Sequence, residues 1–157
     1  MPGPAHKRVQ VRPAVSADMA AIRSLIRLFP KVLVQRSLPR VASFFIARVD
    51  GKIVGCCALQ IYSKRLAEVR SLAVHPDYQD HGVASKLVEC CTQRARERGV
   101  RELFAVTSQT SFFERLGFAT FRREKTAMFL EVTPYSSHSS DASSPARETS
   151  SATKRNP

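Results

Sequence analysis

Residues 66–99 carry the clearest hydrophobic pattern in the chain, a short apolar run followed by a helical repeat. The apolar run ends before Pro76, which lacks a backbone donor and therefore closes a strand. The repeat has the spacing i, i+3, i+4, i+7 and i+11, which is one face of a helix: Ala84, Leu87, Val88, Cys91 and Ala95. Gly99 suits the left-handed residue that ends many helices. This pattern predicts a strand, a polar loop and an amphipathic helix.

Similar patterns predict the other elements. Runs rich in β-branched and aromatic residues predict strands at residues 9–12, 44–49, 53–62, 102–106, 118–121 and 126–132. Helical spacing predicts helices at residues 16–29 and 110–116. The order βαβββαβαββ is that of a mixed α/β (α+β) domain, with an antiparallel first half and a crossover helix in the second.

Local signals refine this outline. Ser16 is a candidate N-cap for the first helix, and Asp18 lies in its first turn, where a negative charge is favourable. The pair Asp50-Gly51 is a strong signal for a two-residue hairpin. Gly55, inside the strand that follows, predicts a bulge or a close approach of another part of the backbone.

The composition changes at Pro134. Beyond it the chain is rich in Ser, Thr, Ala and Pro and shows no periodicity. Such a segment cannot bury enough apolar surface to offset the entropy of ordering it. We therefore expect a flexible N-terminal segment at residues 1–8, one domain at residues 9–133 and a disordered tail at residues 134–157.

Charge and cysteine content narrow the classes of partner. The net charge of +12 favours anionic ligands, but it is spread along the chain, which indicates a solvated basic surface and makes a nucleic-acid partner unlikely. No apolar run is long enough to cross a membrane, and the N-terminus lacks the apolar segment of a secretion signal. The four cysteines form two adjacent pairs without metal-ligand spacing. We expect buried thiols, a cytoplasmic location, and neither a metal nor a membrane partner.

The loop between the predicted strand and helix is a candidate anion site. A helix N-terminus directs unpaired N–H groups and a partial positive charge toward one point. Gly82 lets the backbone approach an anion closely, and the small side chain of Ala84 keeps the first helical turn thin. An ordinary strand-loop-helix unit with a glycine in its loop is the alternative.

Gln79-x-x-Gly82-x-Ala84 resembles the pyrophosphate loop of the GCN5-related N-acetyltransferases (GNAT), which bind acetyl-coenzyme A. The resemblance extends over residues 9–132 and includes the strand before the loop and the segment FFERLGF at residues 112–118. It implies a central sheet of about six to seven strands flanked by about four helices. It also implies a set of residues that bind acetyl-coenzyme A: Leu72, Ala73, Val74, Gln79, Asp80, His81, Gly82, Val83, Ala84, Ser85, Gln109, Phe112 and Phe113.

Acetyl transfer from a thioester to an amine requires a neutral amine, a stabilised oxyanion and a thiolate that can leave. Backbone N–H groups near the end of the strand at residues 66–74 could polarise the thioester carbonyl. Glu68 is the candidate base, because a carboxylate in an otherwise apolar strand is suited to accept the ammonium proton, directly or through water. The alternative is a buried ion pair with Arg70, two residues on and on the same face.

The general acid departs from the family pattern. The tyrosine that usually serves as acid corresponds to Phe113, which cannot donate a proton. Either the thiolate leaves unassisted, or Thr107, Ser108 or water protonates it.

The acceptor is suggested by a resemblance to the acetyltransferase domain of N-acetylglutamate synthases, which serve arginine biosynthesis. It rests on residues 66–79, 103–109 and 112–118, and on Arg36-Ser37. It implies that Arg36 and Arg70 hold the carboxylates of glutamate, that Glu68 and Ser71 are catalytic, and that Thr107 contacts the acceptor. Glu68 and Ser71 face opposite ways on a regular strand, so this arrangement requires a bulge. Pro39 and the short hairpin at residues 119–132 depart from the synthases.

The sequence is also compatible with other functions. The scaffold could acetylate a protein N-terminus, a lysine or a polyamine, or it could be a non-catalytic basic binding module. The expected partner is a small amine with acetyl-coenzyme A as co-substrate, and a homodimer is compatible with the sequence.

Overall fold

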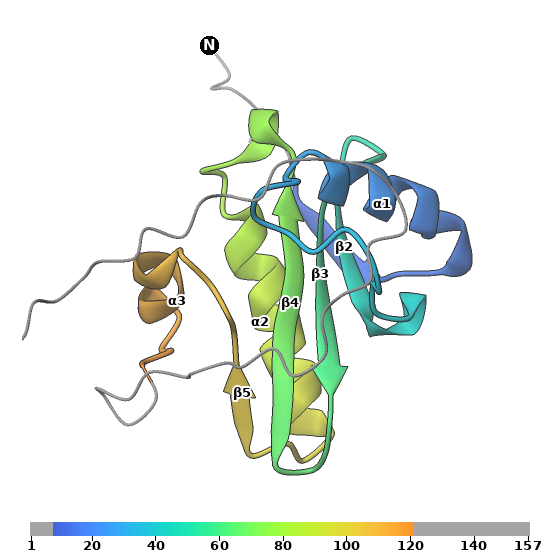
Figure 1. Cartoon of the computed structure of the whole chain (residues 1–157). Coiled ribbons are helices and arrows are strands. Elements are labelled where there is room, and N and C mark those ends of the chain that lie inside the picture. Colours follow the sequence, from blue (N-terminus) through green and yellow to red (C-terminus); the bar gives the residue numbers. More distant parts are fainter. Residues whose placement is uncertain (1–7, 121–157) are drawn as a thin grey trace, which may run out of the picture. The chain divides into compact units, whose positions relative to one another are not determined.

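The computed structural model describes residues 8–120, which form one five-stranded sheet with the strand order β1-β2-β3-β4-β5 (Figure 1). The first four strands pair with one another antiparallel, and β5 pairs with β4 parallel. The strands are β1 (Gln10–Pro13), β2 (Phe44–Val49), β3 (Lys52–Ile61), β4 (Leu66–Val74) and β5 (Glu102–Phe104). The predicted mixed sheet is confirmed for these five strands.

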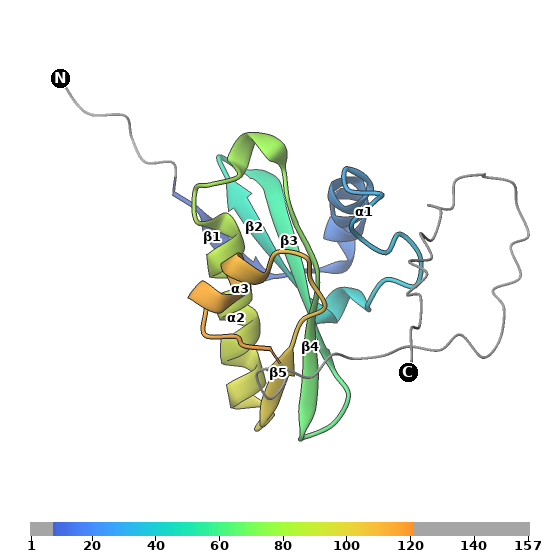
Figure 2. The ribbon, with the colours of Figure 1, turned by 60° about the vertical axis from the view of Figure 1, so that its left-hand side comes forward.

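Two helices cover the sheet, one on each face, as Figure 2 shows. They are α1 (Met19–Arg27) and α2 (Val83–Glu97). A third helix, α3 (Thr110–Arg115), follows β5. Three short 3₁₀ turns complete the described elements: η1 (Ser16–Asp18), η2 (Val41–Ser43) and η3 (Pro76–Tyr78).

The two sheet faces carry separate hydrophobic cores. The α2 face includes Val69, Val83, Leu87, Val88 and Cys91, so the predicted apolar face of this helix is the buried one. The α1 face includes the buried residues Ile22, Ile26, Phe44, Ile46 and Ala73. Burial on both faces explains why β2 and β3 read as nearly continuous apolar runs in the sequence.

The turns at Gly51 and Gly99 lie where the glycines in the sequence predicted them. Asp50 and Gly51 have φ angles of 49° and 79°, as the expected two-residue hairpin requires. Gly99 has a φ of 70°, and the bonds Gly99 N–H to Arg96 O and Val100 N–H to Ala95 O close the end of α2. A Cβ on Gly55 would lie 3.0 Å from side-chain atoms of both Val83 and Leu87, so this glycine allows α2 to approach β3 closely.

Several expected boundaries are wrong. Residues 16–18 form a 3₁₀ turn, so Ser16 is not the N-cap of α1. The strand expected at residues 102–106 ends at Phe104, because the chain turns away from β4 to reach α3. Residues 118–120 are not part of a strand; the Phe118 N–H bonds to Phe113 O instead. The predictions for residues 1–7, the strand at 126–132 and the tail at 134–157 lie outside the described residues.

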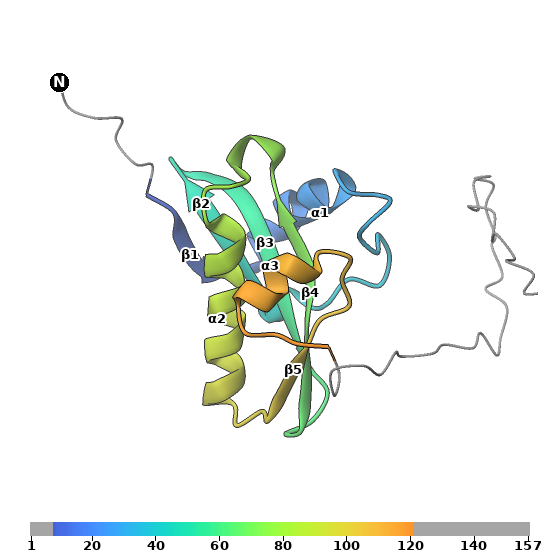
Figure 3. The same ribbon diagram turned by 90° about the vertical axis from the view of Figure 1, so that its left-hand side faces the viewer.

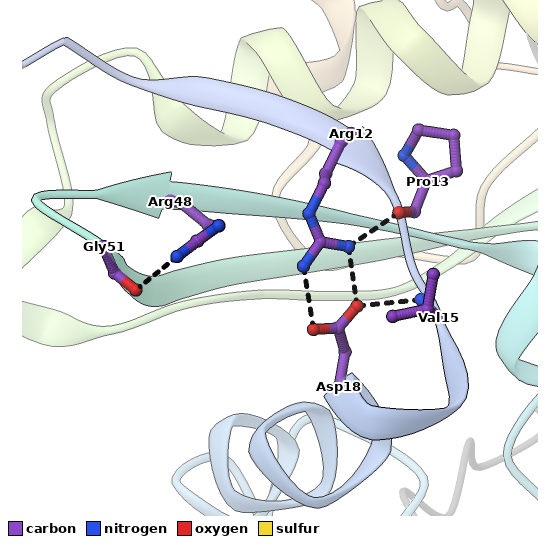
Figure 4. A network of polar contacts seen from close by, with 6 residues as sticks. All are labelled: Arg12, Pro13, Val15, Asp18, Arg48 and Gly51. Carbon is purple, nitrogen blue, oxygen red and sulfur yellow. Dashed lines mark hydrogen bonds and ion pairs between the residues drawn. The ribbon is translucent and has the colours of Figure 1, made fainter.

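Asp18 joins β1 to the start of α1 (Figure 4). Its carboxylate accepts two hydrogen bonds from the Arg12 guanidinium, at 2.7 and 3.0 Å, and one from the Val15 N–H at 2.8 Å. Asp18 is 6% exposed, so these partners compensate for the loss of its hydration. Arg12 and the Val15 N–H hold the pKa of the Asp18 carboxyl below its ordinary value.

We expect Asp18→Asn to lower the free energy of unfolding at pH 7 by about 1–3 kcal/mol, because a partly buried guanidinium and an N–H lose their charged acceptor. A carboxyl with a lowered folded-state pKa stabilises the fold above its unfolded pKa of about 4 and loses this effect as the pH falls through the folded value. Urea unfolding at pH 7 and below pH 4 measures both effects. The difference between wild type and variant should shrink in acid, whereas Glu89→Gln, on an exposed carboxylate of α2, should change little at either pH.

Candidate active site

The loop predicted to bind an anion lies at the N-terminus of α2, beyond the end of β4 (Figure 3). The hydrogen-bond ladder of α2 begins with the Lys86 N–H and Gly82 O, so the N–H groups of Val83, Ala84 and Ser85 precede this ladder. A bound phosphate would accept hydrogen bonds from these N–H groups. The sequence prediction of a strand, a loop and a helix N-terminus at this point is confirmed.

Gly82 is required by backbone conformation and not by local packing. Its φ is 74°, and a Cβ built on it would meet no atom within 4 Å. The space above it is therefore open to a ligand. Gln79 anchors the loop by donating to Val74 O at 3.2 Å, and Nδ1 of His81 lies 2.6 Å from Gln79 O. Gln79, Asp80 and His81 are all exposed at the rim of this loop.

A bulge interrupts β4 at Ser71 and Leu72. Ala73 pairs with Cys56 and Arg70 pairs with Ala58, so two residues of β4 lie opposite the single residue Cys57. Ser71 takes a φ of 54°, which a non-glycine residue adopts only under such constraint. Glu68 and Ser71 can face one site only if β4 has a bulge between them, and the structure contains such a bulge.

Beyond the bulge, β4 has no strand partner on its β5 side among the described residues. The parallel pairing covers only the pairs from Leu66–Glu102 to Glu68–Phe104. Figure 1 shows the chain leaving β5 away from β4 on its way to α3. The backbone groups on this side of residues 72–74 are therefore available to a linear ligand that lies along the strand, as a pantetheine arm would.

Glu68 and Arg70 lie on the α1 face of β4 and are half-buried. The expected alternative for Glu68, an ion pair with Arg70, is not among the salt bridges of residues 8–120. Glu68 instead accepts a hydrogen bond of 2.5 Å from the hydroxyl of Tyr62. This bond raises the pKa of Tyr62 above its ordinary value, an effect that Arg70 opposes.

Tyr62 is a site residue that sequence reasoning missed. It follows β3, stacks on Phe104 of β5 at a ring-centroid distance of 6.3 Å, and so spans the face of β4 to reach Glu68. The available signal was the β3–β4 hairpin itself. Once Gln60 is paired with Glu68, alternation places Tyr62 on the same sheet face.

Arg70 also lines an open groove of about 640 Å³ at the end of β3 opposite the anion loop. The groove is bounded by residues 37–43, residues 59–61 and the C-terminal end of α2. None of its described lining residues carries a carboxylate. Four of them are arginines: Arg40, Arg70, Arg94 and Arg98. Arg36 does not line it, although the neighbouring Ser37 does.

The irregular segment after α1 is held by Gln35, which the sequence did not single out. Its side-chain amide donates to Ile26 O at 3.0 Å and to Leu33 O at 2.9 Å. These bonds satisfy a carbonyl at the end of α1 and turn the chain toward Arg36, which is exposed, and Ser37, which has a φ of 55°.

The residues predicted around α3 have mainly structural contacts. Thr107 accepts a hydrogen bond from the Gln109 N–H at 2.9 Å, and Gln109 precedes the first turn of α3. Phe113 is buried in the core of the α2 face, edge-to-face with Phe112 and Phe118. The ring that replaces the usual tyrosine is therefore a core residue.

The cysteines behave as the sequence predicted, with Cys90 half-buried and the other three buried. Burial raises the pKa of Cys56 to about 12, and the Cys57 and Cys91 thiols are 3.6 Å apart. The hydrogen bond with Cys91, together with burial, raises the pKa of Cys57, and burial raises that of Cys90. The thiolate forms of Cys56, Cys57 and Cys90 are therefore disfavoured, and these thiols are poorly suited to act as nucleophiles. Residues 8–120 contain no cluster of three His, Cys, Asp or Glu that could hold a metal, and none of their helices is long and apolar enough to cross a membrane.

A sheet whose fourth and fifth strands separate beside a glycine loop at a helix N-terminus is suited to a ligand that combines an anionic group with an extended arm, as a nucleotide thioester does. Comparison with known families agrees: residues 19–118 match the acetyltransferase (GNAT) family. The chain belongs to this family and is an N-acetyltransferase enzyme with acetyl-coenzyme A as its co-substrate.

One relative and two solved structures show what the chain is similar to. An amino-acid acetyltransferase of Mycobacterium tuberculosis is 34% identical over 123 residues, which cover 73% of this chain and 71% of the relative. A crystal structure from the same organism, in complex with CoA and NLQ, has a TM-score of 0.66 and 34% identity over 69% of this chain and 70% of the other. The N-acetylglutamate synthase of Neisseria gonorrhoeae, complexed with coenzyme A and N-acetyl-glutamate, has a TM-score of 0.63 and 33% identity. That match covers 69% of this chain but only 28% of the synthase.

Proposed function

We propose that this enzyme transfers the acetyl group of acetyl-coenzyme A to the α-amine of L-glutamate or of a similar small acidic metabolite. The assignment of an acidic acceptor rests on the position of Arg70. This half-buried arginine lies on the same face of β4 as Glu68 and two residues from it. A guanidinium at this point favours an acceptor with a carboxylate close to its reacting amine. The names of the similar proteins support the same class of acceptor.

The anion loop would hold the pyrophosphate of the co-substrate. The N–H groups of Val83, Ala84 and Ser85 are the donors, and the open space above Gly82 admits the phosphates. The pantetheine arm would then lie along residues 72–74 and carry the thioester toward the bulge. Because the bulge reorients the backbone at Ser71, an N–H of this segment can face the thioester oxygen and stabilise the oxyanion.

Glu68 would take the proton from the acceptor ammonium, directly or through water. The neutral amine attacks the thioester carbonyl carbon, a C–N bond forms, the C–S bond breaks and coenzyme A leaves as its thiolate. The second proton of the nitrogen passes to water, and from there to the thiolate, so that the neutral amide is left. Phe113 cannot protonate this thiolate, so water or the thiolate's own modest basicity accounts for its departure. The Tyr62 hydroxyl holds one oxygen of Glu68 and leaves the other available to the acceptor.

Cationic acceptors fit this site less well. Four arginines line the groove beside Glu68, and the chain carries a net charge of +12, so a polyamine or a lysine-rich protein would be repelled. An acceptor with one or two carboxylates would instead be attracted. Glutamate acetylation would place the enzyme in arginine biosynthesis.

The experiment that tests the proposal is a thiol-release assay with acetyl-coenzyme A over the twenty amino acids and a few polyamines. We expect the highest kcat/KM for glutamate, with glutamine at least tenfold lower because it lacks the second carboxylate. Equal values for glutamate and glutamine would exclude glutamate as the specific acceptor. Turnover of a polyamine alone would instead assign another acceptor class to the same scaffold.

A further inference from the structure

The four-arginine groove, formed by Arg40, Arg70, Arg94, Arg98 and the residues between them, begins beside the reacting centre but continues well past it. Gln60 is the direct cross-strand partner of Glu68, so their side chains share one face of the sheet, and Gln60 lines the groove. The same groove extends to Arg98, the residue that follows the last turn of α2 on the other side of the sheet. It therefore passes from the face that carries Glu68, over the edge of β3, to the end of α2.

Within residues 8–120, no strand pairs with the edge of β3 along this path. β2 begins with Phe44 opposite Ala58, so residues 59–61 extend past the end of β2 and have no strand partner there among the described residues. In Figure 1 the β3–β4 hairpin extends below the start of β2. A ligand that crosses β3 from the side of Glu68 can therefore pass over this edge toward the end of α2.

The charged side chains among the described lining residues of the groove are all arginines, so the groove is positively charged. Arg94 is fixed, because its guanidinium donates to Ala42 O at 3.0 Å and lies 3.8 Å from the centre of the Phe45 ring. Arg98 lies one helical turn further along α2, on the same side. The C-terminus of α2 contributes only about half a negative charge, which four guanidinium groups exceed. The groove is therefore suited to several carboxylates held along an extended chain.

The distances fit a short peptide. Neighbouring strands are about 4.8 Å apart, so the path from Glu68 across β3 to its free edge is roughly 10 Å. An extended peptide advances about 3.3–3.6 Å per residue. A peptide whose N-terminal amine lies at Glu68 would place its second and third residues over the edge of β3, within reach of Arg40 and Arg98.

We propose that the four-arginine groove binds the acidic residues that follow the reacting one, so that the acceptors include short peptides that begin with glutamate and continue with acidic residues. This inference rests on the proposed function, because it uses the same transfer of acetyl from sulfur to an α-amine. It adds a substrate class, acidic peptides, to the free acidic amino acid.

The test compares three acceptors in the thiol-release assay with the full chain: glutamate, Glu-Ala-Ala and Glu-Glu-Glu. The two peptides have the same N-terminal residue and the same amide after it, so any difference between them arises from the added carboxylates. We expect kcat/KM for Glu-Glu-Glu to exceed that for Glu-Ala-Ala by about tenfold, as two accessible ion pairs allow, and 1 M salt to remove most of this advantage.

Two variants locate the effect. Arg98→Gln should reduce the advantage of Glu-Glu-Glu about threefold and leave kcat/KM for glutamate unchanged. Arg101→Gln, also an exposed arginine but outside the groove, should alter neither. Equal rates for the two peptides, or turnover of glutamate alone, would overturn the inference and leave the proposed function intact. No thiol release with any of the three acceptors would overturn both.

Discussion

Gly82→Glu is expected to abolish binding of acetyl-coenzyme A, with an affinity loss of at least a hundredfold. Two effects add. The φ of 74° at this position is strained for any residue with a Cβ, which costs on the order of 1–2 kcal/mol. The new carboxylate would also occupy the open space above the loop, where the negative pyrophosphate must lie close to the N–H groups of α2. Calorimetric titration with acetyl-coenzyme A measures the loss.

A second glycine in the same structure provides the control. Gly99, at the other end of α2, has a φ of 70° and no atom within 4 Å of its hypothetical Cβ. Gly99→Glu therefore introduces the same backbone strain and the same charge, but far along the helix from the loop. It should bind acetyl-coenzyme A like the wild type. If Gly82→Glu also kept its affinity within a few-fold, the anion site would not be where the pyrophosphate binds.

The sequence predicted those parts of the site that depend on local signals. The loop before α2 is specified by a proline that ends a strand, a single glycine and a helical repeat, all within residues 74–95. The hairpin at Asp50-Gly51 and the end of α2 at Gly99 were predictable for the same reason, because each depends on one residue that tolerates a positive φ. Such features need no knowledge of what lies across the sheet.

The parts that depend on register were not predictable. Tyr62 reaches Glu68 only because β3 and β4 pair Gln60 with Glu68, and a slip of one residue would place Tyr62 on the other face. The expected partner of Glu68, Arg70, was inferred from alternation along one strand. Glu68 instead accepts its hydrogen bond from across the hairpin, from Tyr62, the residue that follows β3.

The four-arginine groove could not be predicted from the sequence, for another reason. Its walls come from residues 37–43, which have no hydrophobic period, and from the ends of β3 and α2. Nothing in the sequence indicates that β2 begins late enough to leave residues 59–61 uncovered. Arg94 and Arg98 read only as favourable charges near the C-terminus of a helix, where basic residues are common.

Glu68→Gln is expected to lower kcat by about a hundred- to ten-thousandfold while KM for glutamate changes little. Glutamine has nearly the shape of glutamate, and its side-chain oxygen can still accept the hydrogen bond from Tyr62, so the hairpin should keep its geometry. What is lost is the base that receives the ammonium proton. Without it, the rate should increase only as the acceptor amine loses its proton in solution, so the rise of rate with pH should move toward alkaline values. Steady-state thiol release from pH 6 to pH 10 measures both changes.

Two further variants separate chemistry from support. Glu102→Gln, on an exposed carboxylate of β5, should leave kcat unchanged. Tyr62→Phe removes the hydrogen bond but retains the carboxylate of Glu68, so it should cost far less than Glu68→Gln if Glu68 is the base. A clear loss in Tyr62→Phe with little loss in Glu68→Gln, which keeps the hydrogen bond, would mean that Glu68 acts only by holding the β3–β4 hairpin in place. A kcat within twofold of wild type in Glu68→Gln would exclude Glu68 as the base and leave water, activated by the backbone at the bulge of β4, to accept the proton.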